Sequence, residues 1–183
     1  MGAISGGLLF IGYLPYIWAI INHQTTPSPV SWGIWVVLDV MSLLAMRKEK
    51  ANIGQLTAAT VGAFCITALA MIFGKSTILG PVEWFSIVGA VTGIILWKKT
   101  GNALLAIIAS QVAMFAGAIP TFARAYANPM QENPVAWSIW FVSCLCALFA
   151  VRKWDMANAL QPLTFMTIET VMVFLVVIRP HLF

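Results

Sequence analysis

A segment of twenty residues occurs twice in this chain, and the second copy begins 105 residues after the first. The first copy, PVSWGIWVVLDVMSLLAMRK, begins at Pro29, and the second, PVAWSIWFVSCLCALFAVRK, begins at Pro134. The copies align without a gap and are identical at ten of their twenty positions. The match continues upstream at the same offset and pairs Phe10 with Phe115, Gly12 with Gly117 and Pro15 with Pro120. We therefore expect a fold built from two copies of one structural unit.

The composition places this duplicated unit in a membrane. Hydrophobic residues make up 61% of the 183 residues and charged residues only 9%, and the mean hydropathy is +0.91. A soluble domain needs more polar residues than this to cover its surface. The net charge of +4 comes from basic residues that sit in pairs between apolar runs, which is typical of membrane loops and not of nucleic-acid binding. The sequence predicts an integral membrane protein that contacts the lipid bilayer.

Seven apolar segments, each of about 18 to 25 residues, are long enough to cross the roughly 30 Å hydrocarbon core as helices. They comprise residues 4–21, 29–46, 53–73, 81–97, 102–125, 134–151 and 156–178. None alternates strictly between apolar and polar residues, so helices are expected and barrel strands are not. The sequence predicts an all-α membrane protein with seven transmembrane helices.

The repeat divides these helices into groups of three, one and three. Residues 1–75 are predicted to form the first three-helix repeat, residues 76–100 a linker transmembrane helix, and residues 101–183 the second three-helix repeat. Because a single helix separates them, the two repeats are expected to be parallel. Basic residues follow even-numbered helices more often than odd-numbered ones: Arg47, Lys48, Lys50, Lys98, Lys99, Arg152 and Lys153 against Lys75, Arg124 and Arg179. This excess predicts a multi-pass cell-membrane protein with a cytoplasmic N-terminus and an external C-terminus.

Catalytic and metal-binding patterns are missing from the sequence. Cys65, Cys144 and Cys146 all fall within predicted helices, and the last two face different sides of one helix. The two histidines, His23 and His181, lie far apart. No HExxH, GxSxG or Walker pattern occurs. We therefore predict neither an enzyme nor a protein with a metal or cofactor site.

Matched prolines lie inside the first and fifth predicted helices. Pro15 and Pro120 each remove a backbone hydrogen bond and clash with the preceding turn, so both helices are expected to kink at the same depth. Gly12 and Gly117 precede the prolines by three residues, which favours a hinge in each repeat. The alternative is that both prolines are simply tolerated, as prolines often are in membrane helices.

Aromatic residues and one acid line up along the second predicted helix. Trp32, Trp35 and Asp39 follow one another at spacings of three and four residues, which places them on one side of the helix. The second copy has Trp137 and Trp140 but a cysteine in place of the acid. Two such tryptophan pairs, facing each other across a two-fold axis, are suited to hold a flat ligand or a cation. The alternative is an aromatic belt at the membrane surface.

Three polar side chains are predicted near the middle of the bilayer. Asp39 lies about ten residues, roughly 15 Å, from the outer end of its helix, and Glu169 and Gln111 lie at similar depth. A carboxylate at this depth is costly and is normally functional or paired, yet no Lys or Arg is predicted nearby. We expect Asp39 and Gln111 to bind substrate together with the four tryptophans, and Asp39 and Glu169 to be the candidates for proton coupling. A structural hydrogen bond to a neighbouring helix is the alternative for each acid.

Together these features resemble the SWEET and PQ-loop superfamily of membrane transporters, in which two three-helix units with mid-helix prolines are joined by a linker helix. Within it, Trp32, Trp35 and Asp39 are similar to the WxxWxxxN/D signature of the PnuC-type vitamin transporters. The resemblance implies facilitated uptake of a vitamin or nucleoside precursor, with a topology inverted relative to the sugar transporters. The sequence departs from the signature at Cys144, and neither Pro15 nor Pro120 is followed by the glutamine of the PQ-loop group.

The predicted function is that of a transporter for a small polar or aromatic solute, such as a vitamin or nucleoside precursor or a sugar. The solute would cross by facilitated diffusion or proton coupling through a midplane site between the repeats. Its expected partners are the solute and the bilayer, and no nucleic acid is expected. The protein could also form a homo-oligomer. Two other classes remain. One is a seven-helix ligand-binding receptor, as the KDEL receptor resembles the sugar transporters, and the other is a subunit of a larger membrane complex.

Overall fold

The computed structural model describes residues 1–74 and 80–182, apart from the side chains at positions 82, 83, 86, 90 and 120. Within this part the chain is all-helical and contains no strand, which confirms the predicted class. The α-helices are α1 (Gly2–Ile21), α2 (Pro29–Lys48), α3 (Gly54–Phe73), α4 (Pro81–Thr100), α5 (Ala103–Ala127), α6 (Pro134–Phe149) and α7 (Met156–Val173). Three short helices, η1 (Pro129–Gln131), η2 (Phe174–Ile178) and η3 (Arg179–His181), precede α6 or follow α7.

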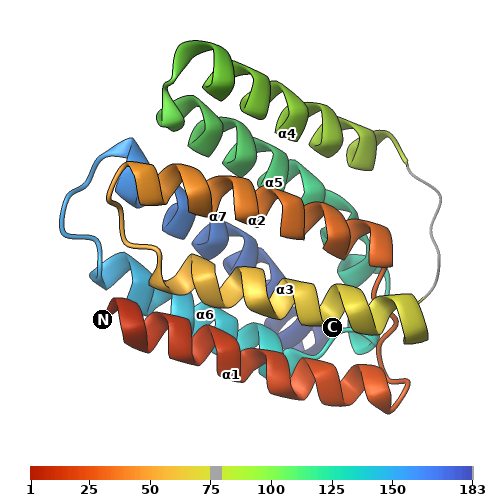
Figure 1. The fold of residues 1–183 in the computed structure, drawn as a ribbon. Coiled ribbons are helices and arrows are strands. Elements are labelled where there is room, and N and C mark those ends of the chain that lie inside the picture. The colour runs from red at the N-terminus through yellow and green to blue at the C-terminus, as the bar shows by residue number, and fades with distance from the viewer. Residues whose placement is uncertain (75–79, 183) are drawn as a thin grey trace.

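The α-helices lie side by side, and successive helices run in opposite directions (Figure 1). In each group of three the last helix contacts both others, because α3 packs against α1 and α2, and α7 packs against α5 and α6. The two groups meet crosswise, with α1 against α6 and α2 against α5. α4 packs against α5 and α2 at the edge of the bundle (Figure 1). The last three helices thus repeat the contacts of the first three.

Five helices of the described residues are long and apolar enough to cross a membrane. They are Gly2–Ile21, Pro29–Lys48, Gly54–Phe73, Ala103–Ala127 and Met156–His181, the last of which combines α7 with the short helices after it. α6 is apolar but has only 16 residues, which corresponds to about 24 Å at 1.5 Å per residue. The chain is therefore a helical multi-pass membrane protein.

The duplicated segments begin their helices in the same way. Ser28 caps α2, since its Oγ accepts a hydrogen bond from the backbone N–H of Ser31 at 3.2 Å. Asn133, at the equivalent position, caps α6, since its Oδ1 accepts one from the backbone N–H of Ala136 at 2.9 Å. A proline follows each cap, in the first turn, where its missing N–H costs no helical hydrogen bond. These caps confirm the predicted starts of both helices.

Small residues allow α4 to approach α5 closely. A Cβ atom built on Gly93 would lie 2.8 Å from the Cβ atom of Ala109, and one built on Gly89 would lie 3.0 Å from that of Ala113. The spacing of four residues on both helices puts these contacts on one face. Such packing of small residues is typical of helix pairs in membranes, and it attaches α4 to the second group of three helices.

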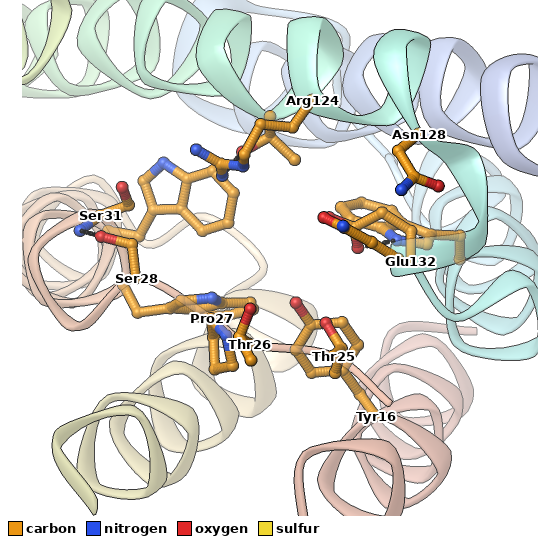
Figure 2. Close-up of a pocket in the computed structure, with 14 residues that line it drawn as sticks. Tyr16, Thr25, Thr26, Pro27, Ser28, Ser31, Arg124, Asn128 and Glu132 are labelled. Carbon is orange, nitrogen blue, oxygen red and sulfur yellow. Dashed lines mark hydrogen bonds between the residues drawn. The ribbon is translucent and has the colours of Figure 1, made fainter. Parts of the chain in front are cut away.

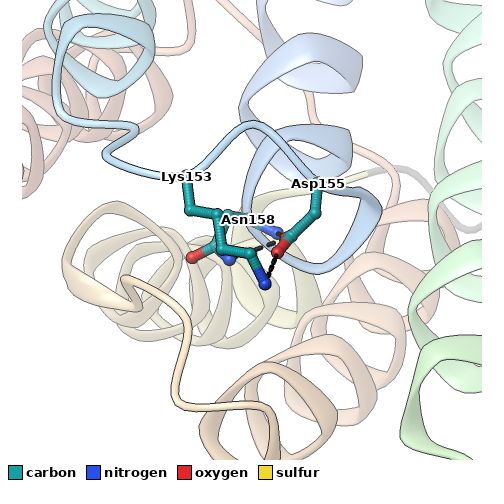
Figure 3. Close-up of polar contacts among 3 residues, drawn as sticks. All are labelled: Lys153, Asp155 and Asn158. Carbon is teal, nitrogen blue, oxygen red and sulfur yellow. Dashed lines mark hydrogen bonds and ion pairs between the residues drawn. The ribbon is translucent and has the colours of Figure 1, made fainter.

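The predicted limits of the last two helices need correction. α6 ends at Phe149, two residues earlier than predicted, because the chain turns there to reach the cap of α7. Asp155 forms that cap, because its Oδ1 accepts a hydrogen bond from the backbone N–H of Asn158 at 3.1 Å. Its carboxylate also accepts a hydrogen bond from Asn158 Nδ2 at 2.8 Å and pairs with Lys153 Nζ at 2.8 Å (Figure 3). The contact with Lys153, followed by that with Asn158, lowers the pKa of Asp155 to about 2. At its other end α7 changes at Phe174 into the π-helical turn of η2.

Candidate functional site

Both groups of three helices contribute side chains to a cavity of about 60 Å³, called here the aromatic cavity. All four tryptophans of the duplicated segments line it, with Trp32 and Trp35 from α2 and Trp137 and Trp140 from α6. Residues of α1, α3, α5 and α7 supply the other walls, most of which are apolar. The aromatic cavity therefore lies between the two groups of three helices.

Two tyrosines of α1 connect the tryptophans of the two copies. The ring centroid of Tyr13 lies 6.4 Å from that of Trp32 and 5.0 Å from that of Trp140. The ring of Tyr16 lies 5.6 Å from Trp32 and 5.5 Å from Trp140. These separations are those of favourable tilted aromatic pairs. Sequence reasoning missed both tyrosines as site residues, although their spacing of three residues already placed them on one face of the first helix.

Polar contacts and a glycine fix the indole rings of α6. Trp140 Nε1 donates a hydrogen bond to the backbone carbonyl oxygen of Leu9 in α1 at 3.0 Å, and Trp137 Nε1 donates one to Glu132 Oε2 at 3.0 Å. Gly12 leaves room for the Trp140 indole, because a Cβ atom at residue 12 would overlap its Nε1 and Cδ1 atoms. Both indoles are 3% exposed. They face the protein interior, whereas the rings of an aromatic belt face the lipid headgroups.

Two carboxyl groups line the aromatic cavity. Asp39 of α2 is 3% exposed and Glu169 of α7 is 7% exposed. Asp39 Oδ1 and Glu169 Oε2 have no hydrogen-bond partner among the described residues. No Lys, Arg or His side chain from the described part of the chain lines this cavity. Burying an ionised carboxyl group without a partner costs several kcal/mol, so these oxygens are suited to take up a proton, a cation or a polar group of a solute.

Gln111, which is predicted to bind substrate, contacts α2 and is not among the residues that line the aromatic cavity. Met114, one turn further along α5, lines the aromatic cavity, whereas Gln111 does not. The side chain of Gln111 instead turns toward α2, where its Nε2 donates a hydrogen bond to Ser42 Oγ at 2.9 Å. Its Oε1 has no partner among the described residues. The sequence indicates the depth of this residue but not which neighbouring helix it contacts.

A polar pocket of about 210 Å³ opens where the α1–α2 and α5–α6 connections meet (Figure 2). Its wall carries hydroxyl, amide and charged groups, among them Thr25, Ser31, Arg124, Asn128 and Glu132 (Figure 2). The polar pocket shares three lining residues with the aromatic cavity, namely Trp32, Trp35 and Trp137. The polar pocket and the aromatic cavity therefore adjoin at these tryptophan side chains.

A hydrogen-bond network lies on the other side of the aromatic cavity. Ser5 Oγ of α1 donates to the backbone carbonyl oxygen of Ser143 in α6 at 2.9 Å, and Ser143 Oγ donates to that of Ser5 at 2.8 Å. Gln55 Nε2 of α3 donates to Ser143 Oγ at 3.2 Å, and Gln161 Nε2 of α7 donates to Gln55 Oε1 at 3.1 Å.

This network also borders a third pocket, of about 670 Å³, at the end of the bundle that carries Lys50, Arg152 and Lys153. Ser5 and Gln55 line this basic-end pocket, which has no lining residue in common with the aromatic cavity. The aromatic cavity thus adjoins the pocket at one end of the bundle and is separated from the pocket at the other.

The structure describes only one of the two predicted hinge prolines in full. Pro15 lies inside α1, which continues to Ile21, and its carbonyl oxygen accepts a hydrogen bond from Asn133 Nδ2 at 3.2 Å. The side chain of Pro120 lies outside the described residues, although α5 continues through that position. Pro162, inside α7, is a buried proline that sequence reasoning overlooked. The hinge role of Pro15 and Pro120 stays a prediction.

Glu132, in the polar pocket, is expected to titrate above the usual range of a carboxyl group. Burial raises the pKa of Glu132, while the Trp137 indole and the Arg124 charge lower it. Because the pKa is raised in the folded state, the protonated form stabilises the fold. The contribution of protonated Glu132 to the free energy of unfolding is complete below its unfolded-state pKa and is lost as the pH rises through its folded-state pKa.

Replacing Trp137 with phenylalanine removes the N–H donor to Glu132 and is expected to raise the pKa of Glu132 further. A ¹³C NMR titration of the side-chain carboxyl measures the pKa in both proteins, and Glu132→Gln identifies the signal by its loss. An equal or lower pKa in Trp137→Phe would contradict the role given to this hydrogen bond.

No family model, curated protein or solved structure matches the chain. The proposed function rests on the residues and geometry of the site, together with the motif resemblance.

Proposed function

We propose that the protein is a membrane transporter that moves a small polar or aromatic solute through the aromatic cavity. The observation that carries this proposal is the meeting of the two WxxW segments around one cavity that also holds two unpartnered carboxyl oxygens. Indole faces bind flat rings and cations, and buried carboxyl oxygens bind hydroxyl or ring N–H groups. A vitamin, a nucleoside precursor or a sugar carries chemical groups that these side chains can bind.

The proposed architecture is two parallel three-helix repeats joined by α4 as a linker helix. The matching contacts within each group of three, and the crosswise contacts between groups, support a two-fold relation along the membrane normal. The excess of basic residues at one end of the bundle supports a cytoplasmic N-terminus. With the WxxWxxxD segment of α2, this arrangement also supports membership of the SWEET and PQ-loop superfamily, near the PnuC-type transporters.

Transport in this proposal requires alternate access from the two ends of the bundle. The polar pocket adjoins the aromatic cavity, while the serine and glutamine network lies toward the basic-end pocket. Solute would enter past Trp32 and Trp35, and would leave after that network opens, with Pro15 and Pro120 as hinges. Because the sequence has no Walker motif, movement would follow the gradient of the solute or that of protons carried by Asp39 or Glu169.

Ligand-dependent thermal stabilisation tests whether the aromatic cavity binds such a solute. We expect a ring-bearing compound from a panel of thiamine, riboflavin, nicotinamide, adenosine, glucose and tryptophan to raise the unfolding temperature of the purified protein. At 100 times its dissociation constant the compound should add about 2.7 kcal/mol to the free energy of unfolding. Asp39→Asn keeps the size of the side chain and removes its charge, so it should weaken this response. A compound that stabilises both proteins equally at every concentration would contradict binding at Asp39.

A further inference from the structure

We propose that the interface between α2 and α5 holds a sodium-binding site built from Asp39, Ser42, Ser110 and Gln111, called here the oxygen cluster. Ser42 follows Asp39 by three residues on α2, so the two side chains are neighbours on one helix face. Ser110 and Gln111 are adjacent on α5, and both hydrogen-bond to Ser42. All four side chains are at most 3% exposed. Three of the four side chains are therefore joined by hydrogen bonds, and Asp39 is the neighbour of Ser42 on α2.

Within the oxygen cluster both serine hydroxyl protons are already donated in hydrogen bonds, while several oxygen lone pairs remain free. Ser110 Oγ donates to the Ile107 carbonyl oxygen at 2.8 Å, so Ser42 must donate the hydrogen bond between the two serine hydroxyls. Gln111 Nε2 donates to Ser42 Oγ. Gln111 Oε1 and Asp39 Oδ1 have no partner among the described residues. Neither serine therefore has a proton left to donate to the carboxylate.

The remaining lone pairs suit a small, hard cation. Such cations prefer carboxylate, carbonyl and hydroxyl oxygens, and the cluster offers one carboxylate, one amide carbonyl and two hydroxyl oxygens. One carboxylate balances one positive charge, whereas a divalent ion would leave an uncompensated charge inside the membrane. This charge balance favours a monovalent cation, and Na⁺ is smaller and harder than K⁺, which suits a site made of oxygen ligands.

The equivalent interface, between α6 and α1, shows what this position looks like without a carboxyl group. Ser5 corresponds to Ser110 and likewise hydrogen-bonds to a serine of the other repeat. The residue equivalent to Asp39 is Cys144, whose sulfur accepts a hydrogen bond from Gln55 Nε2 at 3.3 Å. Every fully buried side-chain oxygen and nitrogen of this neutral network has a hydrogen-bond partner within the described residues. This neutral network, at the equivalent position of the duplicated fold, therefore serves as an internal control for the oxygen cluster.

Sodium binding at the oxygen cluster does not depend on the solute proposal, because it is measured on the purified protein without any solute. The unfolding temperature is determined in NaCl, KCl and choline chloride at equal ionic strength. We expect Na⁺ to raise it in a saturable manner, more than K⁺ does, and choline to have no effect. A protein whose unfolding temperature responds equally to all three salts would overturn the proposal.

Matched serine variants locate the site. Ser110→Ala removes a cluster hydroxyl, and Ser5→Ala makes the same change at an equally buried, equivalent position of the other repeat. We expect Ser110→Ala and Asp39→Asn to weaken the apparent affinity for Na⁺ by roughly tenfold or more, the range for hydrogen bonds to charged groups. Ser5→Ala should retain the affinity of the parent protein. Equal losses in the two serine variants would place the ion elsewhere and overturn the assignment.

Discussion

Replacing Trp35 with alanine is expected to weaken binding of a ring-bearing solute by about 5- to 150-fold. Trp35 lines both the polar pocket and the aromatic cavity, and its ring packs edge-on against Trp32 at 5.0 Å. Stacking of a planar ligand on an aromatic side chain contributes about 1–3 kcal/mol per ring, judged by alanine substitution, which gives this range of affinities. Isothermal titration calorimetry with the panel compound that stabilises the protein most measures the loss directly.

Trp18 offers a matched control for this substitution. It is a tryptophan in the last turn of α1, but its side chain is 57% exposed and lines neither pocket. Trp18→Ala should therefore leave the affinity unchanged. If Trp18→Ala and Trp35→Ala lowered the affinity equally, the tryptophans would act through general packing or membrane anchoring, and the aromatic cavity would not be the binding site.

The largest effect on stability is expected from Gly62→Ala. A Cβ atom on Gly62 of α3 would overlap the ring of Tyr13 in α1, and the Tyr13 hydroxyl is held by a hydrogen bond to the Ala59 carbonyl oxygen at 3.2 Å. The ring cannot move aside without breaking that hydrogen bond or its contacts with Trp32 and Trp140. Such overpacking costs about 1–3 kcal/mol, or roughly 2–12 °C in unfolding temperature for a chain of this size.

Gly7→Ala is the corresponding control, because a Cβ atom built on Gly7 would meet no atom within 4 Å beyond its own stretch of helix, and this residue is exposed on α1. Alanine there should keep or slightly raise the unfolding temperature, since it favours helix more than glycine does. Circular dichroism during heating in detergent compares the two variants. A Gly62→Ala protein as stable as Gly7→Ala would show that α1 and α3 are not packed as described.

The helices and their order could be predicted because their signals are local. Apolar length marked the segments, and the prolines after Ser28 and Asn133 marked where α2 and α6 begin. The duplication indicated which residues are equivalent, and helical depth put Asp39 and Glu169 at one level. The structure adds that both acids line the same cavity.

The contacts between helices could not be predicted in the same way. In a soluble protein the apolar stripe of a helix shows which face is buried, but lipid is as apolar as the interior, so membrane helices lack this signal. The sequence therefore did not indicate that Gln111 turns toward Ser42 or that Tyr13 reaches both tryptophan pairs. The early end of α6 depends on the turn leading to Asp155. The ion pair between Asp155 and Lys153 could be identified only from the structure.

Uptake into proteoliposomes tests the central claim, that the aromatic cavity is a transport site and not only a binding site. The protein is reconstituted, and entry of the radiolabelled panel compound that gives the largest thermal stabilisation is followed over time, with protein-free liposomes as the blank. We predict saturable uptake that Trp35→Ala greatly reduces and Trp18→Ala leaves intact. Tight binding of the compound without uptake above the blank would contradict transport and assign the site to a receptor.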